Sequence, residues 1–162
     1  MATSTGGGSR HVYRLGLNAG TLRHHSTARL RAGAGPRHLA FHPDGRTAYV
    51  ISELDSTITV CAYDPHAGKL RPGQVVSTVP AGTSVANHPG EILASPDGRH
   101  VYGTNRGHDS VAVLATNAGG RLLYVAGQHS GTVTAFKVSG AHLTPAGAPL
   151  AAPAPVCVLP CF

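Results

Sequence analysis

The stretch HLAFHPDGRTAY at residues 38–49 returns as EILASPDGRHVY at residues 91–102, and this repeat decides the fold. Both copies hold Pro-Asp-Gly-Arg, with a Tyr three residues after the Arg. The offset between the copies, from Asp44 to Asp97, is 53 residues. Asp and Gly tolerate a positive φ, so each Asp-Gly pair predicts a tight turn between two short strands.

Short apolar or alternating runs follow each turn and are broken by further turn residues, which is typical of strands. The first copy predicts strands at about 37–42, 47–52, 56–63 and 74–79. Antiparallel units of four strands that repeat at this period are the blades of a β-propeller. We therefore expect an all-β fold built of four-stranded antiparallel meanders.

The chain holds parts of blades rather than a full ring. The third copy follows the second by only 22 residues, from Tyr102 to Tyr124, so 31 residues of the repeat are missing. Residues 121–127 either pair as an outer strand on 110–115 or begin a third blade without its inner strand. The predicted parts are a flexible N-terminus (1–9), the end of one blade (10–34), a complete blade (35–82), a blade without its last strand (89–119), and a blade without its first strand plus a C-terminal segment (120–162).

A partial propeller of this size cannot close a ring alone. Closure is what protects the edges of the sheets in a propeller. Open blade faces would expose apolar surface, so we expect the chain to self-associate through them.

Composition excludes several classes of function. The formal charge is +6, but the basic residues are scattered with no run of three, which argues against nucleic-acid binding and remains compatible with small anionic substrates. No run reaches 18 apolar residues, so no membrane span is expected, and residues 1–10 lack the apolar segment of a secretory signal. Three cysteines without a Cys-x-x-Cys pair favour the cytoplasm, with Cys61 as a core residue.

Eleven histidines raise the question of a metal site. His38 and His42 share a face of a strand but stand about 13 Å apart, because each residue rises about 3.3 Å. Zinc needs its ligands at about 2.0–2.1 Å, so this pair cannot share an ion. We predict neither a metal nor a cofactor.

Meander geometry gathers the candidate site residues. The start of the first strand and the end of the second lie at the same end of a blade, opposite the Pro-Asp-Gly turn. This places Arg37, His38 and Glu53 on one rim, with Arg106 and His108 on the same rim of the next blade. A carboxylate beside Arg can act as a general base, and Arg can hold an anion or a developing oxyanion. Glu53 and Arg106 also share one repeat position, so an ion pair between blades is the structural alternative.

The motifs together resemble the seven-bladed β-propeller lactonase family, which is associated with 6-phosphogluconolactonase and is similar to the cycloisomerase that forms a muconate lactone. The resemblance implies a metal-free site made of a Glu, two Arg and a His. Glu53, Arg37 and Arg106 match the first three as catalytic residues, and the His has no counterpart. His38, His108 and Gln128 are assigned to substrate binding. The motifs are GPRHLAFHPDG (35–45), SELDS (52–56), PGEI (89–92), SPDG (95–98), NRGHDS (105–110) and GQHS (127–130).

Two functions follow. The resemblance implies a hydrolase of a phosphorylated or carboxylated sugar lactone in carbohydrate metabolism, with activity impaired by truncation. The alternative is a non-catalytic propeller fragment, either an interaction module or a degraded gene product. Because the family's histidine is missing, we expect little or no lactone hydrolysis by this chain alone.

Overall fold

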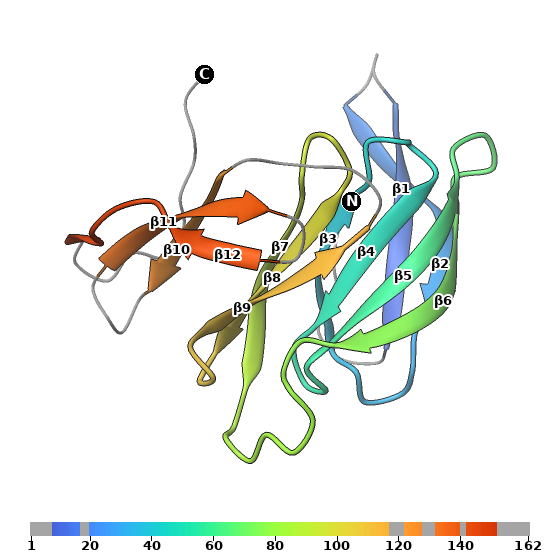
Figure 1. Cartoon of the computed structure of the whole chain (residues 1–162). Helices are drawn as coiled ribbons and strands as arrows, with labels where there is room; N and C mark the ends of the chain where they lie inside the picture. Colours follow the sequence, from blue (N-terminus) through green and yellow to red (C-terminus); the bar gives the residue numbers. More distant parts are fainter. Residues whose placement is uncertain (1–7, 17–19, 117–121, 128–131, 140–141, 152–162) are drawn as a thin grey trace.

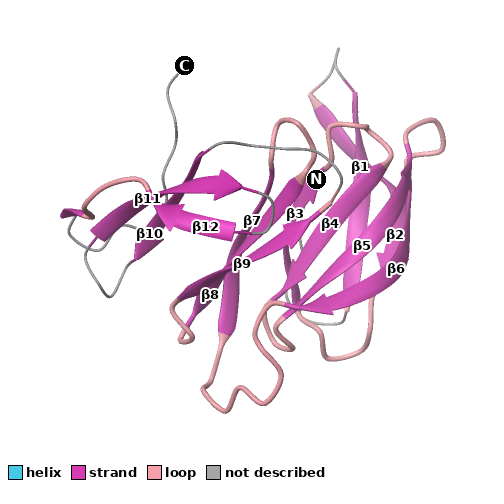
Figure 2. Ribbon diagram, viewed as in Figure 1, coloured by secondary structure: helices cyan, strands magenta, loops and turns pink. Residues whose placement is uncertain are grey.

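A computed structural model describes residues 8–16, 20–116, 122–127, 132–139 and 142–151. These residues form strands and loops, with no helix among them (Figure 2). Four antiparallel sheets follow one another along the chain (Figure 1). The prediction of an all-β chain made of propeller blades is confirmed.

No helix capable of spanning a membrane occurs among the residues that the structure describes.

The first sheet has two strands, β1 (Ser9–Gly16) and β2 (Thr21–Arg29). The sequence places a flexible tail at residues 1–9, whereas β1 already begins at Ser9. This sheet is tied to the next one through the turn before β6. His25 Nε2 lies 2.6 Å from the Ala67 carbonyl oxygen, and the Ser26 hydroxyl donates to the Gly68 carbonyl oxygen at 2.8 Å.

The second sheet is a complete four-stranded meander. Its strands, in spatial and chain order, are β3 (Pro36–Phe41), β4 (Thr47–Ser52), β5 (Thr57–Asp64) and β6 (Lys69–Ser77). The first three match the sequence prediction closely. The fourth begins at Lys69, five residues before the predicted 74–79, because the turn closes early. Asp64 Oδ1 accepts the His66 and Ala67 amides there, and Gly68 takes a φ of 58°.

The third sheet has three strands, β7 (His88–Ala94), β8 (His100–Arg106) and β9 (Ser110–Ala115). Among the described residues, β9 pairs with β8 alone. The fourth sheet starts with β10 (Leu122–Gly127), which pairs with β11 (Thr132–Ser139). The alternative in which residues 121–127 complete the third sheet is therefore wrong. The junction at 117–121 lies outside the described residues.

Two short strands finish the fourth sheet. β12 (His142–Pro145) and β13 (Leu150–Ala151) pair with successive parts of β11. The sheet therefore begins, among the described residues, with β10, the strand that carries Tyr124. The division of the chain into blades by residue range stays a prediction.

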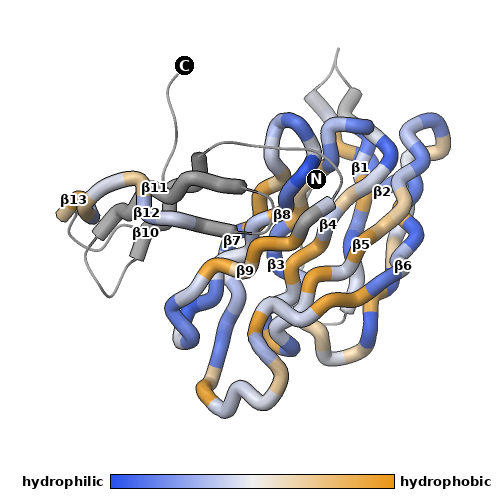
Figure 3. The backbone as a smooth tube through the Cα atoms, in the orientation of Figure 1, coloured by the Kyte–Doolittle hydropathy of each residue, from blue (hydrophilic) through white to orange (hydrophobic). Residues whose placement is uncertain are grey.

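The core lies on both faces of β4. Ala48 and Val50 point to a cluster with β1 and β2, where Val12, Ala28, Cys61 and Leu70 are also buried. Tyr49 and Ile51 point the other way, toward Ile58, Ile92 and Val101. Alternate residues of a strand face opposite sides, so a strand between two sheets is apolar throughout. The tube in Figure 3 is correspondingly hydrophobic along much of β4 and β5. Cys61 is a fully buried core residue, as predicted.

Candidate functional site

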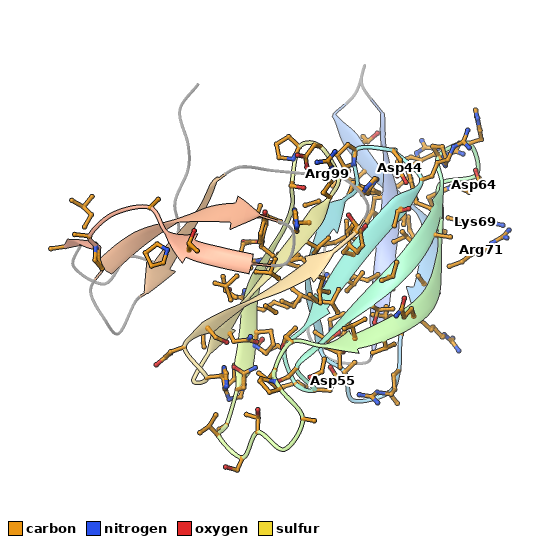
Figure 4. All side chains as sticks on the ribbon, in the orientation of Figure 1. Asp44, Asp55, Asp64, Lys69, Arg71 and Arg99 are labelled. Atoms are coloured by element: carbon orange, nitrogen blue, oxygen red, sulfur yellow. The ribbon has the colours of Figure 1, made fainter. Side chains whose placement is uncertain are left out.

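The candidate residues lie at one end of the second and third sheets. The pairing of the strands places them there. Pro36 pairs with Ser52 at the end of the β3–β4 hairpin away from its turn, and His88 pairs with Arg106 at the same end of the next sheet. The Asp-Gly turns close the opposite end, where Figure 4 places Asp44 and Arg99 far from Asp55. The predicted separation of turns and charged residues is confirmed. We call the following five residues the charged rim: Arg37, His38, Glu53, Glu91 and Arg106.

The first strands of the second and third sheets, β3 and β7, both depart from regular pairing at the charged rim. In β3 the register shifts between Pro36 and His38, which leaves Arg37 as the extra residue. In β7 it shifts between Pro89 and Ile92, so two residues, Gly90 and Glu91, oppose one on β8. A β-bulge re-aims side chains that would otherwise alternate between the two faces. As a result, Arg37 and His38, although adjacent in the chain, both reach residues of β7.

Glu53 lies between the two arginines. Arg106 Nη2 donates to Glu53 Oε1 at 2.5 Å, and Arg37 Nε lies 3.7 Å from Glu53 Oε2. The Glu53 side chain is 27% exposed, that of Arg37 29% and that of Arg106 46%, so the group is in contact with solvent. The structure therefore brings together the three residues predicted to be catalytic, and it also forms the inter-blade ion pair of the alternative interpretation.

Backbone carbonyls fix the two guanidinium groups. Arg37 Nη1 donates to the Gly90 carbonyl oxygen at 2.7 Å, and Arg106 Nε donates to the His88 carbonyl oxygen at 3.0 Å. A Cβ at Gly90 would stand 2.8 Å from Thr104 Oγ1 and 3.7 Å from Arg106 Nε. The absence of a side chain at this position lets the Arg106 side chain pass close to β7.

His38 forms a second pair on the charged rim. Its Nδ1 lies 2.9 Å from Glu91 Oε2. Glu91 is itself held, since its Oε1 accepts the Ile92 amide at 2.9 Å and its own amide donates to Thr104 Oγ1 at 2.8 Å. His38 was predicted to bind substrate, and the structure places it beside a carboxylate on the neighbouring blade.

Of the other two residues assigned to substrate binding, the structure describes only His108. His108 lies in the loop after β8, where its Nδ1 is 2.7 Å from the Ser110 hydroxyl and its amide donates to Asn87 Oδ1 at 3.4 Å. It has no contact with the Arg37–Glu53–Arg106 group in the part of the chain that the structure describes. Gln128 lies outside the described residues.

Two acidic residues near the charged rim have local structural contacts. Asp55 Oδ1 accepts the Thr57 hydroxyl at 2.6 Å, and Asp55 Oδ2 accepts Arg31 Nη2 at 2.7 Å. Asp109 takes a φ of 51° and accepts the Gly107 amide at 3.3 Å. Both residues therefore act as caps of the turns in which they lie, since Asp side chains bond to nearby groups of their own turn.

The described residues hold no group of three or more His, Cys, Asp or Glu side chains close enough to share a metal ion. His42, considered with His38 in the sequence, instead lies at the opposite end. Its Nδ1 is 3.1 Å from Asp44 Oδ2, and its Nε2 is 3.0 Å from the Gly98 carbonyl oxygen.

The sequence prediction missed the pairing of His38 with Glu91, because it treated the inner strands as regular. A signal for the bulges was present in Pro36 and in Pro89-Gly90. Proline within a sheet is confined to edges, strand starts and bulges, and glycine in a strand often marks a bulge. A bulge-aware prediction would have placed these two side chains on the same side as the arginines.

Known proteins share this arrangement of strands. A 6-phosphogluconolactonase of Bacillus subtilis is 41% identical over 115 residues, which are 70% of this chain and 33% of the relative. One from Erwinia tasmaniensis is 37% identical over 107 residues, 66% of this chain and 32% of the relative. The chain therefore spans about a third of the length of these relatives.

Solved structures match over more of the chain. A Lactobacillus plantarum protein superposes with a TM-score of 0.83 at 28% identity, over 91% of this chain and 50% of its own. The periplasmic gluconolactonase of Pseudomonas aeruginosa gives 0.80 at 25% identity, over 91% of this chain and 49% of its own. The fold is thus a partial propeller. The family model described as lactonase, seven-bladed beta-propeller, matches residues 2–122, and the chain belongs to this family.

Proposed function

We propose that the charged rim is the anion-binding part of a site that opens a phosphorylated or carboxylated sugar lactone by hydrolysis. The observation that carries the proposal is the pair of guanidinium groups held on either side of Glu53. Lactone opening passes through a tetrahedral oxyanion, and fixed N–H donors aimed at that charge lower its energy.

Glu53 serves to keep the two arginines in place. Its two oxygens each face a guanidinium, so its negative charge offsets part of the repulsion between the two cations. Arg37 Nη2 and Arg106 Nη1 donate to no acceptor within the described ranges, and each guanidinium nitrogen of this kind carries two N–H groups. These donors suit a phosphate, a carboxylate or the developing oxyanion.

Relatives support this choice of substrate class, because two of those compared are named 6-phosphogluconolactonase. The net charge of +6 favours approach of an anion. The cytoplasmic location and self-association through open blade faces stay predictions. The interaction-module alternative gives the charged rim a structural role only, so ligand binding distinguishes the two.

Calorimetric titration with 6-phosphogluconate, the anion left when 6-phosphogluconolactone opens, tests the proposal. We expect the chain to bind it, and Arg37→Ala and Arg106→Ala each to weaken binding at least about tenfold, as loss of a charged hydrogen bond does. Arg46→Ala and Arg99→Ala are matched controls from the opposite end, and they should bind as the unchanged chain does. Absence of binding, or an equal loss in all four variants, would contradict the proposal.

A further inference from the structure

The charged rim holds a histidine–carboxylate pair, His38 with Glu91, beside the group of Arg37, Glu53 and Arg106. We infer that His38, oriented by Glu91, is the general base that activates water for lactone opening. This inference rests on the proposed function, because it assigns a further role at the same site.

The hydrogen bond to Glu91 selects the tautomer of His38. With Nδ1 2.9 Å from a carboxylate oxygen, a neutral imidazole carries its proton on Nδ1 and keeps the lone pair on Nε2. In the described part of the chain, Nε2 of His38 has no hydrogen-bond partner. The side chain is 39% exposed, so water can reach this nitrogen.

Two contacts hold the Glu91 side chain in one orientation. The Ile92 amide occupies its Oε1, so only Oε2 is left to face His38. The Thr104 hydroxyl fixes the backbone at the same residue by accepting the Glu91 amide. Glu91, whose side chain is 49% exposed, therefore acts through His38 as a positioning residue, in the way that a carboxylate orients a catalytic imidazole in hydrolases.

The imidazole and the two arginines converge on the same segment of β7. Arg37 binds the carbonyl of Gly90, His38 faces Glu91, and Arg106 binds the carbonyl of His88. Arg37 and His38 are consecutive residues, so their Cα atoms lie about 3.8 Å apart. Behind them, Arg10 of β1 donates to the His38 carbonyl oxygen at 3.2 Å and supports this part of β3.

Glu53 is less suited to the role of base. Its Oε1 accepts Arg106 Nη2 and its Oε2 faces Arg37 Nε at 3.7 Å, so a water molecule would share each oxygen with a guanidinium group. Imidazole is also the side chain that ordinarily exchanges protons near neutral pH. The residues therefore have separate roles. The arginines, held by Glu53, bind the anion, and His38 transfers the proton.

His38 Nε2 takes a proton from water as the water oxygen forms a bond to the lactone carbonyl carbon, and the carbonyl oxygen becomes an oxyanion beside the arginines. The bond from that carbon to the ring oxygen then breaks, and the ring oxygen takes the proton from His38. Water is consumed, the product is a hydroxy acid, and the imidazole returns neutral.

The test uses the whole chain with 6-phosphogluconolactone, measured against the spontaneous rate. We expect His38→Ala to lower kcat about 100-fold or to the spontaneous rate, with KM little changed, and imidazole in the buffer to restore part of the rate. Glu91→Gln should lower kcat about tenfold, and Glu91→Asp should recover part of it. His42→Ala and Asp44→Asn remove the histidine–carboxylate pair of the opposite end and should leave the rate unchanged.

A spectroscopic measurement separates positioning from folding. In nitrogen NMR of the imidazole groups, His38 should show the Nδ1–H tautomer, and Glu91→Gln should abolish that preference while the rest of the spectrum is preserved. A His38→Ala chain with the full rate, or a His38 tautomer with the proton on Nε2, would overturn the inference.

The failure of this inference can be told apart from failure of the proposed function. A chain that binds 6-phosphogluconate through the arginines but does not accelerate lactone opening would overturn the role of His38 and leave anion binding in place. A chain that does neither would overturn the proposed function and the inference with it.

Discussion

Arg106 and Glu53 occupy the same position of consecutive repeats, 53 residues apart, and they bind each other across two sheets at 2.5 Å. Two further contacts of the charged rim also join positions 53 residues apart, Arg37 with Gly90 and His38 with Glu91. Because equivalent positions of neighbouring blades lie side by side, opposite charges placed there form a row of contacts between blades. This row of contacts joins the second sheet to the third.

The Glu53–Arg106 pair should stabilise the packing of the two sheets, though only modestly because both side chains reach solvent. A double-mutant cycle with Glu53→Gln, Arg106→Gln and the double variant should give a coupling free energy of about 0.5–1 kcal/mol. Urea unfolding would measure it. A coupling of zero would mean that the pair holds the arginine for ligand alone.

Gly103 marks the closest approach of β8 to the complete blade. A Cβ at this position would stand 3.1 Å from the Cδ1 atoms of both Ile51 and Ile58. Gly103→Val should therefore lower the free energy of unfolding by about 1–3 kcal/mol, as overpacking of a core does. Gly147→Val is the control, because a Cβ there meets nothing within 4 Å. Equal unfolding midpoints for the two variants would show that the sheets do not pack in this way.

The buried charge of Arg10 should lower the free energy of unfolding. Arg10 is fully buried, and its Nε and Nη1 have no hydrogen-bond partner among the residues that the structure describes. Burial lowers the pKa of its guanidinium to about 10. A base with a lowered native pKa opposes folding while it is charged in both states, so the cost is present at neutral pH and fades only above pH 10.

Arg10→Met should accordingly raise the free energy of unfolding at pH 7 by about 1 kcal/mol or more, since apolar replacement of a poorly paired buried charge is often stabilising. Thermal unfolding measures the change. Arg14→Met, at an exposed position of the same strand, should change it by less than about 0.5 kcal/mol. A destabilised Arg10→Met chain would mean that the bond to the His38 carbonyl outweighs the burial of the charge.

Protonation of Asp64 should make the free energy of unfolding depend on pH. Hydrogen bonds from the Ala67 and His66 amides lower the pKa of this carboxyl below its ordinary value. An acid with a lowered native pKa adds stability that is complete above its unfolded pKa, about 3.9, and is lost as the pH falls through the native value. Unfolding of the unchanged chain and of Asp64→Asn should therefore differ at pH 6 and converge toward pH 2. A difference that is constant over this range would contradict the assignment.

The repeated Pro-Asp-Gly-Arg segments made the blades predictable. An Asp-Gly turn with apolar residues on both sides fixes a hairpin locally, and β4 is apolar from Ala48 to Ile51 because its sheet lies between two others. The position of Glu53 beside Arg106 followed from the repeat offset alone. The start of β6 was not predictable in the same way, since it depends on Asp64 accepting two amides of the turn.

The pairing of His38 with Glu91 could not be obtained from strand alternation. Regular alternation sends Arg37 and His38 to opposite faces, and only the bulge at Arg37 brings both toward β7. The burial of Arg10 could not be predicted from the sequence either, because a single charged residue at the start of a strand ordinarily points to solvent. Each depends on how two distant segments pack, which local pattern does not encode.

The most direct test of the proposed hydrolysis is the rate at which the purified chain opens 6-phosphogluconolactone, compared with the spontaneous rate. The missing family histidine leads us to expect little or no hydrolysis, whereas a base at His38 implies a measurable acceleration. The site is open to solvent, which weakens the attraction between the arginines and the oxyanion, so we predict that this acceleration is slow. Arg37→Gln and Arg106→Gln should lower it to the spontaneous rate, whereas Arg99→Gln should leave it unchanged. A rate equal to the spontaneous one in the unchanged chain, or an acceleration that survives both rim substitutions, would contradict hydrolysis at the charged rim.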